Sequence, residues 1–250
     1  MTVDSIIAAL CLPADARVDQ RVPKKLLVEN GAPTAADKRQ INDGIEELHW
    51  LAALKPATIG VPTFRDDTRE YLEIAVLSLI LRPGARAVRL TELVHRAIPY
   101  PVFLIQVQPK GYGLSLAHLR WSQGQSEQMV LDGSIMTAEL SEQTPATAEF
   151  LASLSLTSQP RQHLYAFYQG WIERFEAYAA AHLTGRFTPA TDTASAERRR
   201  TALADHERLT REIASLRARA TKERQLNRRV KLNLELKRLE ASLAEAARQF

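Results

Sequence analysis

Acidic side chains near two expected strands could hold a divalent cation. Asp66 and Asp67 border one strand, Glu73 occupies it, and Lys110 follows another strand that ends near Gln106. Metal-dependent nucleases with mixed sheets use carboxylates to hold Mg²⁺ and a lysine to steady the attacking water. The pattern is imperfect, because a glutamine is a poorer ligand than a carboxylate and the lysine is displaced by two positions. Asp66, Asp67, Glu73 and Lys110 therefore stand as an alternative catalytic set.

Motifs for other chemistries are missing from the sequence. The ten Gly are scattered and form no phosphate-binding loop, and the six His have neither HxxxH nor HExxH spacing. Cys11 is the single cysteine, so it can form neither a disulfide framework nor a zinc site with these histidines. No apolar run is long enough to span a bilayer. We expect a non-enzymatic, cytoplasmic protein that needs neither metal nor cofactor and has no membrane partner.

Positive charge is the second chemical feature, and it is concentrated near the C-terminus. Residues 194–250 contain 15 Lys and Arg against 8 Asp and Glu, a net charge of +7, whereas residues 1–193 contain 18 against 21, a net charge of −3. One acidic residue, Glu223, interrupts a dense basic segment made of Arg217, Arg219, Lys222, Arg224, Arg228, Arg229 and Lys231. Such a segment suits a nucleic-acid backbone or an acidic protein surface. A solvated helical face is the alternative.

The elements that would carry these residues are interspersed helices and strands. Apolar periodicity and capping residues predict helices over 3–10, 34–55 and 91–98, and β-branched runs predict strands over 57–61, 71–81, 102–107, 113–121 and 128–136. Short glycine-containing turns join the last three strands. The fold class is therefore α/β or α+β, with a mixed sheet flanked by helices.

Two further helices are expected over 146–156 and 161–183. The second has an apolar stripe with intervals of 4, 3, 4 and 3 residues, formed by Leu164, Tyr168, Trp171, Phe175 and Tyr178. Packing against the sheet is the favoured role for this stripe, and a base-stacking surface is the alternative. The domain that these elements build extends over 1–189, and residues 190–195 form a linker.

The tail is expected to be one basic coiled-coil helix over 196–250, because it contains neither Gly nor Pro. Its apolar positions form two frames, one through Leu209, Ile213, Leu216 and Ala220 and one through Leu232, Leu236, Leu239 and Leu243. The frames do not join in register. The break predicts a stutter, a local unwinding, or a bend that folds the helix back as an antiparallel hairpin. The second frame is the expected coiled-coil interface, in a homo-oligomer if the interface joins two copies.

Several short motifs resemble a bacterial family classed as a domain of unknown function. The clearest are Arg21-Val-Pro-Lys-Lys-Leu-Leu27, Ala97-Ile-Pro-Tyr-Pro101 and Lys222-Glu-Arg-Gln-Leu-Asn-Arg-Arg-Val230. The resemblance covers most of the chain. It implies genes placed beside helicases and DNA methyltransferases in restriction-like or antiphage loci, and it implies no catalytic residues.

Charge, tail and resemblance together predict an accessory or adaptor subunit of a DNA-linked antiphage or restriction-like complex. Its expected partners are a helicase or another defence-locus protein, and DNA bound by the basic tail. The sequence leaves two alternatives open, a divergent Mg²⁺-dependent nuclease and a purely architectural dimerisation protein.

Overall fold

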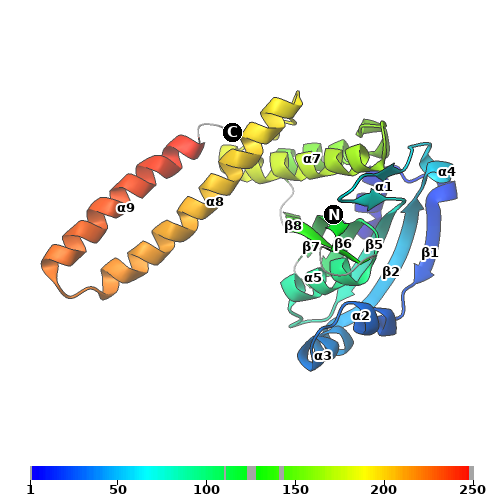
Figure 1. Cartoon of the computed structure of the whole chain (residues 1–250), viewed down its shortest axis with the longest axis horizontal. Helices are drawn as coiled ribbons and strands as arrows, with labels where there is room; N and C mark the ends of the chain where they lie inside the picture. The colour runs from blue at the N-terminus through cyan, green and yellow to red at the C-terminus, as the bar shows by residue number, and fades with distance from the viewer. Residues whose placement is uncertain (1, 110, 123–127, 141–143, 248–250) are drawn as a thin grey trace. The chain divides into compact units, whose positions relative to one another are not determined.

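The computed structural model describes residues 2–109, 111–122, 128–140 and 144–247 (Figure 1). The chain divides into two compact units, Met1–Phe175 and Glu176–Phe250. Helix α7 (Leu164–Thr184) crosses the boundary between them. The first unit contains the sheet, and the second is helical.

A six-stranded mixed sheet organises the first unit, in the order β1-β2-β5-β6-β7-β8. Only β5 and β6 are parallel among these described strands, and α5 connects them. The strands are β1 (Arg17–Arg21), β2 (Ile45–Leu54), β5 (Ile74–Leu81), β6 (Val102–Gln108), β7 (Gly111–Trp121) and β8 (Met129–Leu140). A separate two-stranded sheet pairs β3 (Phe64–Arg65) with β4 (Glu70–Tyr71). These pairings confirm the mixed α/β class.

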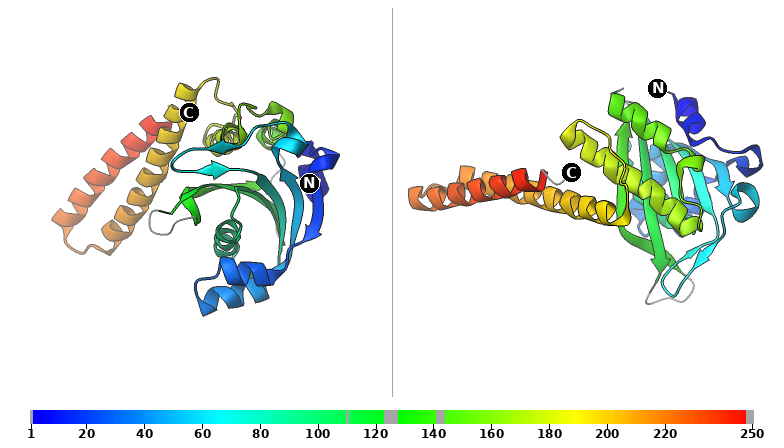
Figure 2. Two further views of the ribbon diagram at one scale, coloured as in Figure 1. Left: turned by 45° about the vertical axis from the view of Figure 1, so that its right-hand side comes forward. Right: turned by 90° about the horizontal axis from the view of Figure 1, so that it is seen from above.

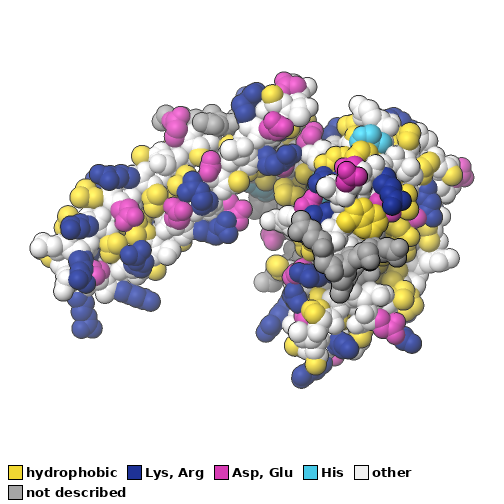
Figure 3. All heavy atoms as spheres, in the orientation of Figure 1, with side chains coloured by type: hydrophobic (Ala, Val, Ile, Leu, Met, Phe, Trp, Pro, Cys, Tyr) yellow, Lys and Arg dark blue, Asp and Glu magenta, His cyan; other side chains and the backbone are white. Residues whose placement is uncertain are grey.

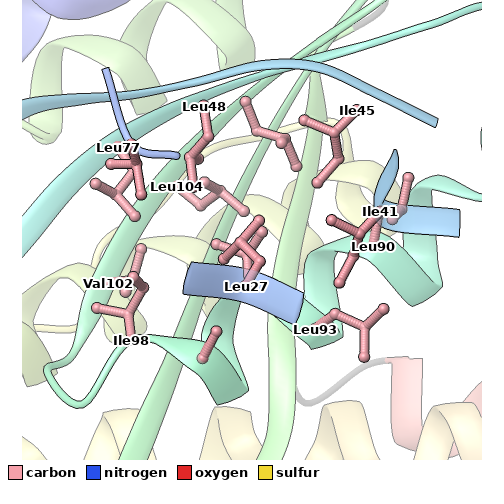
Figure 4. Packing of buried hydrophobic residues seen from close by; sticks show 14 of the residues in the cluster. Leu27, Ile41, Ile45, Leu48, Leu77, Leu90, Leu93, Ile98, Val102 and Leu104 are labelled. Atoms are coloured by element: carbon pink, nitrogen blue, oxygen red, sulfur yellow. The ribbon is translucent and has the colours of Figure 1, made fainter. Parts of the chain in front are cut away.

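Helices α2 (Lys24–Asn30), α3 (Ala35–Gly44) and α5 (Ala87–Ala97) cover one face of the sheet. Their buried side chains interlock with alternate residues of the central strands, because successive strand residues point to opposite faces (Figure 4). Leu77 and Leu104 from the strands meet Leu27 and Leu93 from the helices in this core. The apolar face of α5 thus packs against the parallel pair β5 and β6.

The opposite face of the sheet packs against the first half of α7, as Figure 2 shows. Phe103 of β6 lies with its ring centroid 4.7 Å from that of Trp171, and Phe150 of α6 (Pro145–Ser153) lies 5.3 Å from Phe175. The Tyr168 hydroxyl donates to the Val102 carbonyl at 2.7 Å. Tyr168, Trp171 and Phe175 of the aromatic stripe are therefore part of the first unit's core, as the favoured interpretation predicted.

Several expected elements are wrong. The helix expected over 34–55 ends at Gly44, and its second half is the strand β2, which pairs with both β1 and β5. The spacing of Ile45, Leu48 and Ala52 fits a helical face, but it also fits a strand covered on both sides. The strand expected over 57–61 is instead the short helix α4 (Pro56–Ile59), because a proline at the first position favours helix initiation.

The N-terminal region is more structured than its sequence indicates. Helix α1 (Val3–Leu10) is confirmed, whereas the 3₁₀ turn Ala14–Ala16, β1 and α2 were not predicted. Helix α5 begins at Ala87 rather than at the expected cap Thr91, whose hydroxyl donates to the Ala87 carbonyl inside the helix. A second 3₁₀ turn, Leu156–Ser158, follows α6.

The second unit contains an antiparallel helical hairpin formed by α8 (Thr193–Lys222) and α9 (Leu226–Ala247). The two helices lie side by side in Figures 1 and 2. The expected single helix over 196–250 is therefore wrong, because the chain reverses at residues 223–225. The break between the two apolar frames was predicted to be a stutter, a local unwinding or an antiparallel hairpin. The structure contains the hairpin. Among the described residues, no helix is both long and apolar enough to cross a membrane.

Candidate nucleic-acid interface

The turn of the hairpin is short and well bonded. The Glu223 amide donates to the Arg219 carbonyl at 3.1 Å, and the Glu223 carboxylate accepts from the Gln225 amide at 2.8 Å. The Gln225 carbonyl accepts from the Arg229 amide at 3.0 Å and starts α9. A reversal without glycine or proline is possible here because Glu223 takes an extended backbone conformation.

The hairpin closes over a small apolar seam. Ile213, Leu216 and Ala220 of α8 form a buried cluster with Leu236 of α9. The remaining predicted interface residues, Leu232, Leu239 and Leu243, are partly buried and pack against this cluster. The expected coiled-coil interface therefore joins two helices of one chain, which leaves these leucines little surface for a second copy.

Basic side chains gather where the seam ends, as the space-filling view shows at the turn of the hairpin (Figure 3). An open groove of about 810 Å³ lies there between the last turn of α8 and the first turns of α9. Five cations line it, namely Arg219, Lys222, Arg224, Arg228 and Lys231, together with the two carboxylates of Glu223 and Glu235. The lining thus has a formal charge of +3. The backbone amides at the N-terminus of α9 add to this positive field.

The two other cations of the basic segment do not line the groove. Arg217 forms an ion pair with Glu240 across the two helices, at 2.6 Å. Arg229 belongs to a different side of α9 from Arg228 because successive helical residues are about 100° apart. The structure therefore brings together five of the seven predicted binding residues and gives Arg217 a cross-helix role.

The described members of the alternative catalytic set, Asp66, Asp67 and Glu73, do not form a metal-binding group. Asp66 caps its own turn, accepting from the Thr68 hydroxyl and amide at 2.8 Å and from the Arg69 amide at 2.7 Å, and these bonds lower the pKa of Asp66. Glu73 forms an ion pair with Lys55 at 2.9 Å, which raises the lysine pKa. Among the described residues no group of three acidic, His or Cys side chains could hold a metal. Lys110 lies outside the described residues.

A polar network that sequence reasoning missed lies between the first unit's sheet and α7. His118 is bonded at both ring nitrogens, to the Tyr71 hydroxyl at 2.5 Å and to the Gln169 side-chain oxygen at 3.0 Å. Burial raises the pKa of Tyr71 well above its usual range. Arg69 bonds the Tyr165 hydroxyl at 2.7 Å and the Asp132 carboxylate at 2.9 Å. Because these hydrogen bonds join side chains of different elements, the network orients β4, β7 and β8 against α7.

A second buried polar pair was also missed. The His95 ring nitrogen Nε2 lies 2.9 Å from the Ser115 hydroxyl, and the Gln106 amide donates to the same hydroxyl at 3.4 Å. Burial lowers the pKa of His95 to about 4, so the ring is neutral at pH 7. Ser115 is fully buried, so the pair has the geometry of a hydrogen-bonded core group and not of an exposed nucleophile. A helix containing His95 and a strand containing Ser115 were both predicted. The contact between these two side chains was not.

Comparison with known proteins identifies one family. Residues 10–243 match the domain of unknown function DUF4391, a span that includes the sheet, α7 and nearly all of the hairpin. No curated protein and no solved structure matches the chain. Because the match extends over most of the sequence, the chain belongs to the DUF4391 family.

Proposed function

We propose that this protein is an accessory, non-enzymatic binding subunit of a DNA-linked defence complex, and that the groove at the hairpin turn binds the phosphate backbone of nucleic acid. The observation that carries this proposal is the convergence of five cations, from two helices and the turn between them, on one open groove. The resemblance to a family with genes beside helicases adds a helicase as the expected protein partner. The nuclease alternative lacks a ligand cluster among the described residues. The leucines predicted for the dimerisation alternative, Leu232, Leu236, Leu239 and Leu243, pack within the hairpin of one chain.

The groove suits a polyanion better than a small anion. Its cations lie on both walls and on the turn, so a chain of phosphates can contact several of them in succession. Arginine contributes three of the five, and its planar guanidinium can form two parallel hydrogen bonds to one phosphate. Contacts of this kind position nucleic acid and do not read its bases. We therefore expect binding that varies little with sequence.

The test removes charge without removing helix. In the groove variant Arg224→Gln, Arg228→Gln and Lys231→Gln, three of the cations that line the groove become neutral residues of similar helical propensity. Each lost phosphate contact removes counterion release. The negative slope of log affinity against log salt should therefore become shallower by about two to three units with duplex DNA. Fluorescence anisotropy with labelled duplex and single-stranded DNA and RNA measures this slope.

The matched control removes three exposed cations elsewhere on the hairpin, through Arg198→Gln, Arg211→Gln and Arg238→Gln. None of the three lines the groove. The control should change the salt slope by less than about one unit. Equal losses in both variants would show diffuse attraction instead of a groove, and a wild-type protein without salt-dependent binding would reject the proposal.

The partner part of the proposal has its own experiment. The tagged full-length chain is co-expressed with the helicase that the resemblance predicts in the same locus. The two are co-purified after nuclease treatment, which removes any bridge made by nucleic acid. Retention of the helicase is the expected result. Loss of the helicase after nuclease treatment would show that the two proteins share DNA and do not bind each other.

A further inference from the structure

Helix α9 has a second apolar face that the hairpin does not use. Leu226, Val230 and Leu234 are 63%, 49% and 57% exposed, and they recur every four residues, so they lie along one side of the helix. This side faces away from the seam leucines, because Leu232 and Leu236 lie about 160° and about 120° from Val230 around the helix. We define the exposed stripe as these three residues.

The stripe is unusual on this molecule. Among the described residues seven large hydrophobic side chains are exposed, and three of these seven lie within nine residues of α9. Valine also lowers helix stability at an exposed position, because its branched side chain loses rotamer freedom against the preceding turn. The stripe therefore does not serve the hairpin itself, which is already closed by its seam.

Cations border the stripe. Between 226 and 238 the helix has five basic residues and a single carboxylate, and the carboxylate, Glu235, lines the groove on another side. At 100° per residue, Lys237 falls within the stripe, Arg229 falls on one flank, and Lys231 and Arg238 fall on the other. An apolar row between positive flanks is complementary to a helix that has an apolar row between negative flanks.

From this complementarity we propose that the stripe docks an acidic amphipathic helix of a partner protein. The stripe extends over eight residue steps, about 12 Å at 1.5 Å per residue, which matches slightly more than two turns of a bound helix. A second copy of this chain fits less well, because symmetric pairing would place the basic flanks of the two copies against each other. The three apolar residues of the stripe do not line the groove, and Lys231 is the one flanking cation that also does. The docking proposal can therefore be tested independently of nucleic-acid binding.

The probe is a synthetic helical peptide of three heptads, with leucines along one face and glutamates on both flanks. The comparison peptide has lysine in place of each glutamate. Fluorescence anisotropy should show that full-length protein binds the acidic peptide and not the basic one at physiological salt. The stripe variant Leu226→Gln, Val230→Gln and Leu234→Gln should weaken acidic-peptide binding by at least about tenfold, as loss of a central apolar contact does.

The chain offers a closely matched control. Leu26→Gln, Leu72→Gln and Val88→Gln replace the same residue types at exposed positions of the first unit, 46%, 48% and 88% exposed. This control should bind the acidic peptide like wild type. The proposal is rejected if the control weakens binding as much as the stripe variant, if both peptides bind equally, or if neither binds.

Binding of either of two other partners to the stripe would also contradict the proposal, and each would give a distinct experimental result. Concentration-dependent doubling of mass in light scattering, abolished by the stripe variant, would identify a second copy. Sedimentation with phosphatidylserine vesicles, abolished by the stripe variant but without binding of the acidic peptide, would identify an anionic membrane surface.

Discussion

His95 shows how a single buried side chain couples this fold to pH. Burial places the pKa of the folded-state ring at about 4, below the usual value of 6.5. The unfolded chain therefore binds more protons than the folded chain between these two pH values. Stability should be complete above pH 6.5 and should fall as the pH drops toward 4, by at most about 3 kcal/mol from this residue.

The prediction is tested with His95→Gln, which keeps a polar side chain beside Ser115 but cannot titrate. Chemical unfolding at pH 7.5 and pH 4.5 should show a smaller loss of stability in the variant than in wild type. His49→Gln is the control, because His49 is partly exposed beside Glu47. A pH dependence that is equal in wild type and His95→Gln would contradict the burial argument.

Gly31 is required for close approach between two helices. A Cβ at this position would lie 2.6 Å from the Leu93 carbonyl oxygen and 2.7 Å from the Ala97 Cβ, both in α5. Gly31→Ala should therefore separate α2 from α5 and lower the free energy of unfolding by about 1–3 kcal/mol, as overpacking does. Gly113→Ala is the comparison, because its Cβ would meet nothing closer than 3.6 Å. Urea unfolding monitored by circular dichroism measures both.

At the scale of elements, the hairpin depends on a small seam. Leu236 is the buried residue that α9 contributes to the cluster with Ile213, Leu216 and Ala220. Leu236→Asp places a charge in that seam and should cost about 3 kcal/mol or more, enough to open a two-helix element. Far-ultraviolet circular dichroism should lose helical signal, and trypsin should cut near residues 223–225.

Leu234→Asp is the matched control, since it introduces the same charge two residues away on the exposed side of α9. Its helical signal should equal that of wild type. A Leu236→Asp variant that keeps full helical signal while its mass halves in light scattering would instead support a seam between two copies, as the architectural alternative predicts.

At the scale of the whole molecule, two surfaces on one helix should be separable by mutation. The stripe variant leaves every charge in place, so it should bind DNA with the wild-type salt slope while it loses the acidic peptide. The groove variant retains the three apolar side chains of the stripe and loses one flanking cation, Lys231. It should therefore lose DNA affinity while it retains most peptide binding. A stripe variant that loses both activities would mean that the hairpin is unfolded, which circular dichroism would report.

Net charge is distributed unevenly between the hairpin and the rest of the chain. Residues 194–250 have a net charge of +7 and the preceding residues a net charge of −3, so the proposed binding of polyanions is expected from the hairpin. The DUF4391 match includes both units up to residue 243, so the basic turn is part of the family's domain and not an appendage to it.

Elements with one strong local pattern could be predicted from the sequence alone. The aromatic stripe of α7 predicted its burial because a helical face of five large side chains has to be covered. Strands β6, β7 and β8 were predicted because short turns join apolar runs of strand length. The position of the basic segment could also be predicted, because charge follows directly from residue type.

Other elements depend on long-range contacts, because their local patterns fit more than one structure. Residues 45–54 became a strand because β1 and β5 supply partners on both sides, although their spacing also fits a helix. The tail reversed at residues 223–225 because folding back buries the frame of Ile213 and Leu216 against that of Leu236 and Leu239, which one extended helix would leave exposed. The groove exists only through that reversal, since it brings Arg219 and Lys222 of one helix opposite Arg228 and Lys231 of the next.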